Sequence, residues 1–355
     1  MFKLGLGALV ALLFAALSVG GVHAVEMTTS VSSAHKRALK TYRPAPRHKR
    51  AQRLIAAPAP DQVVKRVVMV RGKRKVVYQP IMRALPVPIE RLSAGDLAGL
   101  NLTRDPLDLK SSVALVMDQG NAEVLFEKNA NVALPIASIT KLMTGLIVVE
   151  AQQNMDEMLV VTEQDVDREK FSHSRLKVGS ELTRSNMLHI ALMSSENRAA
   201  SALGRNYPGG LPAFVAAMNA KARALRMANT HYVDANGLSS QNVASARDLA
   251  KLAIAAYQHP LLREYSTDPK SVIDASGRPM QFNNTNYLVA DPRWEIGLQK
   301  TGYISEAGRC LLMQAVIDGR AVIMVFLDSK GKLSRTADAG RMRKWLEALK
   351  PPGLS

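Results

Sequence analysis

The chain is organised around residues 135–149, which read Pro135-Ile136-Ala137-Ser138-Ile139-Thr140-Lys141-Leu142-Met143-Thr144-Gly145-Leu146-Ile147-Val148-Val149. After Lys141 this stretch is almost wholly apolar, which predicts a helix buried at the centre of a domain. Ser138 and Lys141 stand three residues apart and therefore share one face of that helix, at the end where free backbone N–H groups point outward. This arrangement suits a serine nucleophile whose hydroxyl proton is taken by a neutral lysine.

The Ser-x-x-Lys pattern is not specific by itself, because it occurs four times in the chain. The other matches are Ser33…Lys36, Ser174…Lys177 and Ser329…Lys332. Only Ser138…Lys141 opens a long apolar helix, whereas a surface serine near a surface lysine is the ordinary interpretation of the others. We therefore take Ser138 and Lys141 as the candidate centre.

Two further segments carry groups that an acyl-transferring serine needs. Ser195-Glu196-Asn197 interrupts an apolar helical stretch, and its hydroxyl and amide suit a proton relay and a hydrogen bond to Lys141. Lys300-Thr301-Gly302 follows a strand-like run, where a cation and a hydroxyl suit a substrate carboxylate and the glycine admits a substrate strand. A second cation near Lys141 is also expected to lower the pKa of its amine.

The ordered set Ser-x-x-Lys, Ser-x-Asn and Lys-Thr-Gly resembles the signature of the penicillin-binding proteins and serine β-lactamases. The sequence looks most like the low-molecular-mass penicillin-binding proteins of serine peptidase family S11, over about residues 110–350. Its Ser-Glu-Asn form, and Gly302-Tyr303 leading into Ala307-Gly308-Arg309-Cys310-Leu311, are most similar to the D-alanyl-D-alanine endopeptidases of the penicillin-binding protein seven type.

This resemblance implies a serine D,D-peptidase that hydrolyses D-alanyl bonds in peptidoglycan stem peptides through an acyl-enzyme on Ser138. Lys141 is then the general base, and the backbone N–H groups of Ser138 and Tyr303 form the oxyanion hole. β-Lactams are implied as covalent inhibitors, and no metal or other cofactor is required. The residues implied for the site are Ser138, Lys141, Ser195 and Asn197 in catalysis, and Lys300, Thr301, Gly302 and Tyr303 in substrate binding.

Three alternatives stay open. Endopeptidases cleave the D-alanyl cross-link and carboxypeptidases remove a terminal D-alanine, and the resemblance favours the endopeptidase. About 50 residues follow Gly302, too few for the additional C-terminal β domain and anchor helix of many related carboxypeptidases, which also favours it. A β-lactamase is disfavoured because no Glu-x-x-Leu-Asn string lies between Glu150 and Asn186. A non-catalytic wall-binding protein is disfavoured because no motif residue is missing.

The order of elements predicts an α+β fold. Short strands are expected at residues 112–117 and 122–126 and again at 310–317 and 321–327, with helices between them and a closing helix at 336–349. The intervening helices are expected at 186–203, interrupted by 194–197, at 214–227 and from Ser245 to His259. One antiparallel sheet covered by the central helices follows from this order. The resemblance implies the serine β-lactamase/transpeptidase-like fold, in which the antiparallel sheet packs with an all-helical region and the active site lies between them.

The N-terminal segment is predicted to direct export. Residues 1–24 read as a signal peptide, with Lys3 before an apolar run and Val22 and Ala24 flanking a cleavage point; an uncleaved anchor is the alternative. The rest is expected outside the inner membrane, in the periplasm if the host is Gram-negative.

Cys310 is the only cysteine and is expected to be buried and inert. The seven histidines show no metal-ligand spacing.

Residues 25–92 are predicted to be a basic, Pro- and Ala-rich, mostly disordered linker before the catalytic domain at 93–350. Within 25–91 there are 16 Lys and Arg against 3 Asp and Glu, which gives +13 of the chain's net charge of +17. The β-branched residues of 63–78 favour local order. The charge suits contact with an anionic wall polymer or a membrane surface, although a solvated linker without a partner is the alternative. A nucleic-acid partner is not expected for an exported protein.

Overall fold

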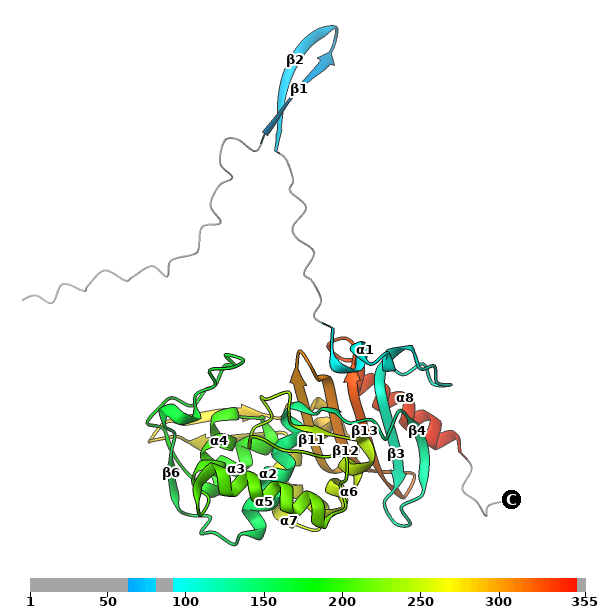
Figure 1. Cartoon of the computed structure of the whole chain (residues 1–355). Coiled ribbons are helices and arrows are strands. Elements are labelled where there is room, and N and C mark those ends of the chain that lie inside the picture. The colour runs from blue at the N-terminus through cyan, green and yellow to red at the C-terminus, as the bar shows by residue number, and fades with distance from the viewer. Residues whose placement is uncertain (1–62, 81–91, 350–355) are drawn as a thin grey trace, which may run out of the picture. The chain divides into compact units, whose positions relative to one another are not determined.

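The structure is a computed structural model that describes residues 63–80 and 92–349 (Figure 1). The chain divides into two units, residues 1–85 and 86–355. In the first, β1 (Val63–Val70) pairs antiparallel with β2 (Lys73–Pro80). Arg71 and Gly72 join the strands with φ of 50° and 75°, the positive values that a tight two-residue hairpin turn requires. The local order expected at 63–78 is confirmed, whereas the predicted signal peptide lies outside the described residues.

The second unit contains a five-stranded antiparallel sheet in the order β11-β12-β13-β3-β4. Its strands are β3 (Ser111–Asp118), β4 (Val124–Lys128), β11 (Glu295–Ile304), β12 (Gly308–Ile317) and β13 (Arg320–Ser329). Val116 on β3 lies opposite Met324 on β13, so the two ends of the domain meet at the middle of the sheet. This confirms the prediction that one antiparallel sheet takes its strands from both ends.

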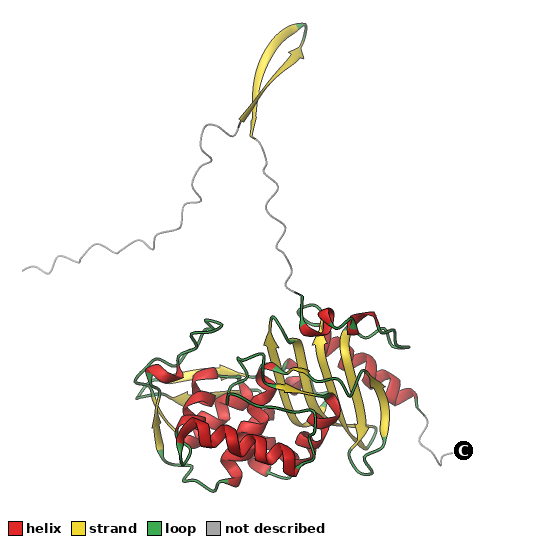
Figure 2. Ribbon diagram, in the orientation of Figure 1, coloured by secondary structure: helices red, strands yellow, loops and turns green. Residues whose placement is uncertain are grey.

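The sheet is covered on both faces, which explains why its central strands are apolar almost throughout. Val113 and Leu115 on β3 face the core shared with the helical region, whereas Ala114 and Val116 face the core beneath α8 (Ser334–Ala348). Figures 1 and 2 show α8 on one side of the sheet and the remaining long helices gathered on the other. The domain therefore has three layers, and its α+β class is as predicted.

The helical region lies between β4 and β11 in sequence. Its helices are α2 (Thr140–Glu150), α3 (Arg184–Met193), α4 (Asn197–Arg205), α5 (Gly210–Ala224), α6 (Ala246–Tyr257) and α7 (Pro260–Thr267). The predicted break at 194–197 separates α3 from α4. The helix expected to reach His259 ends at Tyr257, and Pro260 opens α7, because a proline disfavours helical geometry in the residue before it. None of the helices in the described ranges has the length and apolar character needed to span a membrane.

Short elements complete the domain. The remaining helices are α1 (Ala94–Leu97), η2 (Leu100–Leu102), η3 (Ala137–Ile139), η4 (Glu163–Asp165) and η5 (Tyr287–Ala290). The minor strand pairs are β5 (Leu134–Pro135) with β8 (Val243–Ala244), β6 (Met158–Val160) with β7 (Glu181–Thr183), and β9 (Lys270–Asp274) with β10 (Pro279–Asn283).

Helix α2 is the centre of the domain, and every residue from Thr140 to Val148 is buried. The structure differs from the prediction at its start, because Ser138 lies in the 3-10 turn η3 and not in the helix proper. Ala137 enters this turn with φ of 47°, a left-handed value that is uncommon outside glycine. The turn raises Ser138 at the entrance of α2, where its side chain is half-buried.

Candidate active site

Ser138 and Lys141 are in direct contact. The Lys141 Nζ donates a hydrogen bond to the Ser138 Oγ at 2.8 Å, and the lysine side chain is fully buried. The same amine donates to the Asn197 Oδ1 at 2.7 Å and to the backbone carbonyl of Asn236 at 2.5 Å. Three acceptors therefore fix the amine beside the serine hydroxyl.

Burial makes Lys141 a base at neutral pH. Desolvation lowers the pKa of its amine to about 7, against the opposing effect of the Asp234 and Glu196 carboxylates, which raise it. A neighbouring cation was the predicted cause, and burial is the principal one. Because about half of the Lys141 amines are neutral near pH 7, the side chain can accept the Ser138 proton under ordinary conditions.

Ser195 faces the centre from the turn between α3 and α4. Its φ of 62° is a strained left-handed conformation, of the kind that functional turns often retain. Its Oγ accepts a hydrogen bond at 3.0 Å from the Nζ of Lys300, which also donates to the Thr301 carbonyl at 2.9 Å. Burial lowers the pKa of Lys300 well below its usual range, and the charges of Lys141 and Arg335 lower it further. An anionic ligand would favour the charged form of this amine.

Strand β11 passes directly against the nucleophile turn, and Gly302 permits this approach. A Cβ atom at that position would lie 2.8 Å from the carbonyl oxygen of Ile136 and 3.1 Å from the Ser138 nitrogen. Thr301 forms a 2.6 Å hydroxyl–hydroxyl hydrogen bond with Thr285, and Tyr303, the residue after Gly302, is 57% exposed. The strand edge is therefore close to Ser138 and open to a ligand at Tyr303.

All eight residues predicted for the site lie in this one region, although they come from three separated segments.

Three other residues of chemical interest lie outside this site or support it. Asn242, which ends a second Ser-x-Asn string at Ser240-Gln241-Asn242, is buried and donates to the Thr140 Oγ1 at 3.1 Å, so it holds the start of α2. His231 is exposed, and Cys310 is buried with its thiol pKa raised to about 12. The prediction that Cys310 is buried is confirmed.

Sequence reasoning missed three contributors. The Asn236 carbonyl that binds Lys141 is a backbone group, which no residue pattern reveals. Ser172 accepts a 2.8 Å hydrogen bond from the Asn197 Nδ2 and orients that amide. Arg335, at the start of α8, donates to the Gly302 carbonyl at 2.8 Å and braces β11 from the other side of the sheet. Only the fold brings these groups to the centre.

Comparisons with known proteins agree with this geometry. The profile of the D-alanyl-D-alanine carboxypeptidase family, peptidase S11, matches residues 101–331. The chain is 47% identical over 253 residues to a D-alanyl-D-alanine endopeptidase of Pseudomonas aeruginosa, a match that covers 70% of this chain and 80% of the relative. It is 42% identical over 265 residues to a D-alanyl-D-alanine endopeptidase of Escherichia coli, covering 74% and 85% of the two chains.

A solved structure shares the arrangement of the domain. The crystal structure of penicillin-binding protein D2 from Listeria monocytogenes with bound ampicillin matches with a TM-score of 0.60 and 28% sequence identity. The match covers 68% of this chain and 98% of the Listeria protein.

Proposed function

The chain belongs to the D-alanyl-D-alanine carboxypeptidase family of serine peptidases, and from this membership we propose that it hydrolyses D-alanyl peptide bonds in peptidoglycan. Its fold is the serine β-lactamase/transpeptidase-like fold of that family. The observation that carries the proposal is the 2.8 Å contact between the Ser138 hydroxyl and a buried lysine amine whose pKa is about 7. A neutral amine at this distance removes the hydroxyl proton as the serine attacks.

The reaction proceeds through an acyl-enzyme. The Ser138 Oγ bonds to the scissile carbonyl carbon while its proton passes to Lys141, and backbone N–H groups of Ser138 and Tyr303 stabilise the carbonyl oxygen. The proton then reaches the leaving amine through the Ser195 hydroxyl, and the C–N bond breaks. Water attacks the ester in the second step and releases the acid and the free serine. Lys300 donates to the Ser195 Oγ at 3.0 Å, so the Ser195 hydroxyl proton stays available for this relay.

We propose the cross-link between two stem peptides as the principal substrate. The relatives at 47% and 42% identity carry the name D-alanyl-D-alanine endopeptidase, whereas a relative from Bacillus subtilis named D-alanyl-D-alanine carboxypeptidase is 28% identical. Carboxypeptidase activity on a terminal D-alanine is the second candidate, because the family profile carries that name. The same residues perform the chemistry in both cases, so the two activities differ only in the binding of the leaving group.

β-Lactams are proposed as covalent inhibitors that acylate Ser138. Fluorescent penicillin should label the purified protein and should not label Ser138→Ala. Ser33→Ala provides a matched control, because it removes a serine from another Ser-x-x-Lys match in the chain. Labelling of Ser138→Ala would overturn the nucleophile assignment.

The cleavage products test the substrate. Purified protein should convert cross-linked muropeptide dimers into monomers, and Ser138→Ala should leave the dimers intact. Release of free D-alanine from monomeric pentapeptides, with dimers unchanged, would identify a carboxypeptidase instead.

Export to the periplasm, through the segment 1–24, is part of this proposal because the substrate lies outside the inner membrane. The β1–β2 hairpin is proposed to contact an anionic membrane surface there. It carries six Lys and Arg and no acidic residue, and Val67, Met69 and Tyr78 are 58%, 65% and 63% exposed. Vesicles with phosphatidylglycerol should retain the protein and vesicles of phosphatidylcholine alone should not; equal retention would contradict the contact.

A further inference from the structure

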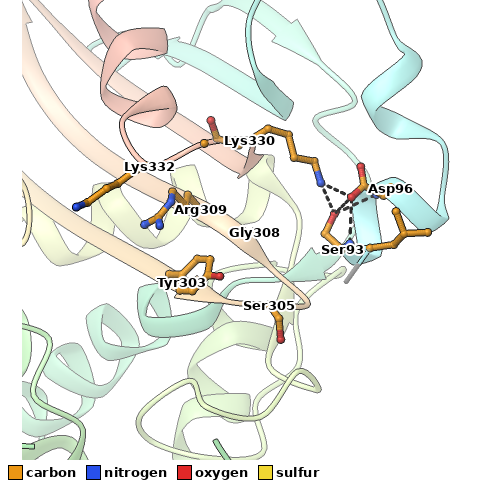
Figure 3. A pocket seen from close by; sticks show the side chains of 11 residues that line it. Ser93, Asp96, Tyr303, Ser305, Gly308, Arg309, Lys330 and Lys332 are labelled. Atoms are coloured by element: carbon orange, nitrogen blue, oxygen red, sulfur yellow. Dashed lines mark hydrogen bonds and ion pairs between the residues drawn. The ribbon is translucent and has the colours of Figure 1, made fainter. Parts of the chain in front are cut away.

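A cavity opens beside Tyr303, at the end of the sheet where β11 turns into β12 (Figure 3). Its volume of about 560 Å3 lies within the range of small-ligand pockets in proteins. Tyr303, which follows Gly302 in β11, forms part of its wall, so the cavity is continuous with the predicted substrate-binding edge. The polar side chains around it are Ser93, Asp96, Ser305, Arg309, Lys330 and Lys332.

One wall of the cavity is neutralised within the protein. Lys330 forms an ion pair with Asp96, donates to the Ser93 Oγ at 3.0 Å and lies 3.6 Å from the Asp328 carboxylate. Asp96 also accepts from the Ser93 hydroxyl at 2.9 Å within the N-terminal cap of α1, and its ion pair with Lys330 anchors α1 beside the sheet. Figure 3 shows this cluster on the opposite side of the cavity from Arg309 and Lys332. These contacts fix the wall and leave it with little net charge.

The other wall carries cations without acidic partners. Neither Arg309 nor Lys332 forms an ion pair with any residue of the ranges 63–80 and 92–349. Arg309 lies opposite Tyr303 in the β11–β12 register, and its guanidinium stacks over the Tyr303 ring at 4.6 Å from the centroid. The nearby Glu306 is engaged elsewhere, by Lys170 at 2.6 Å. The cavity therefore presents a preorganised guanidinium and a flexible ammonium to solvent, which suits an anionic ligand.

The direction in which a substrate peptide would lie along β11 explains why a cavity at the β11–β12 turn matters. In the proposed reaction the leaving group lies beside Lys300 and Thr301, and the scissile carbonyl lies at the Tyr303 N–H. The donor peptide therefore runs from Tyr303 toward Ser305. An extended peptide advances about 3.3 Å per residue, so its second and third residues before the scissile bond reach the β11–β12 turn. The cavity opens at this turn.

We infer that the cavity is a subsite for the acyl-donor peptide, in which Arg309 and Lys332 bind a free carboxylate on the third residue before the scissile bond. The inference rests on the proposed function, since it takes the direction of the peptide from the reaction. It makes Arg309 and Lys332 specificity-determining residues that select an acidic donor peptide. A planar guanidinium held over an aromatic ring is suited to bidentate recognition of a carboxylate.

The test compares two synthetic cross-linked dimers that differ in one group. In one dimer the donor stem carries a γ-linked D-glutamate with a free α-carboxylate, and in the other this carboxylate is an amide. The wild type should cleave the acid with a kcat/KM about tenfold above that of the amide, the effect expected for one charge-assisted contact in a half-open site. Arg309→Gln with Lys332→Gln should lower the acid/amide ratio to about one.

Matched variants separate the subsite from general effects of charge and folding. Lys344→Gln removes an exposed lysine on α8, on the other face of the sheet, and should keep the wild-type ratio. Arg309→Lys should retain part of the preference. Titration with fluorescent penicillin gives the concentration of folded, acylatable enzyme to which every rate is normalised.

The outcomes distinguish this inference from the proposed function. Equal cleavage of both dimers by the wild type would overturn the subsite and leave the peptidase intact. Persistence of the acid preference in the double variant would also overturn it. Failure to cleave either dimer, in a protein that penicillin labels, would overturn the proposed substrate and the subsite with it.

Discussion

The pKa of Lys141 predicts how acylation depends on pH. For a lysine with an ordinary pKa of 10.5, about one amine in 3000 is neutral at pH 7; with the pKa lowered to about 7, about one half is neutral. The neutral amine is the base, so the rate must rise with pH as Lys141 loses its proton. We expect the rate at pH 5 to be about one hundredth of the plateau and that at pH 8 to be about nine tenths of it.

The rate constant for acylation by fluorescent penicillin, measured by stopped flow between pH 5 and 9, checks this profile. Circular dichroism at each pH should confirm that the protein stays folded over the range. A rate that is constant from pH 5 to 8, or that rises only above pH 9, would refute the assignment of a buried, neutral Lys141 as the base.

Glu196 provides an internal test of the same reasoning. Its carboxylate raises the pKa of Lys141, so Glu196→Gln should lower that pKa and move the acidic limb of the profile toward lower pH. Glutamine keeps an oxygen that can accept the hydrogen bonds of Ser174 and of the Arg198 backbone. Glu123→Gln, in the exposed β3–β4 turn, is the matched control and should not move the limb. A shift toward higher pH in Glu196→Gln would contradict the electrostatic argument.

Three further predictions concern packing around the nucleophile and the thiol. Gly302→Ala places a Cβ 3.1 Å from the Ser138 nitrogen and 2.8 Å from a neighbouring carbonyl oxygen, so penicillin acylation should fall at least tenfold while the circular dichroism spectrum is retained. Gly237→Ala places a Cβ 2.0 Å from the Ala137 carbonyl oxygen at a φ of 79°, and urea titration should show a loss of about 2 kcal/mol or more in unfolding free energy. Cys310, with a thiol pKa of about 12, should react with Ellman's reagent at pH 8 only after unfolding. Full acylation, unchanged stability or a reactive native thiol would contradict the respective prediction.

The sequence by itself determined the parts of the site that depend on short-range geometry. Ser138 and Lys141 contact each other because residues three apart share a face wherever the chain is helical. The apolar run after Lys141 required burial of that helix, and the order of strands and helices indicated the α+β class. Resemblance in three short motifs then identified the chemistry.

Only the tertiary structure decided how those motifs meet and what their groups can do. The contact between Lys300 and Ser195 joins segments far apart in the chain, and it depends on the packing of the α3–α4 turn against β11. The lowered pKa of Lys141 is chiefly a consequence of burial, which spacing along the chain does not specify. The cavity beside Tyr303 likewise exists because β11, β12 and α1 converge there. Solvent exclusion and non-local contacts are properties of the folded chain, so the energetics of the site emerge only with the fold.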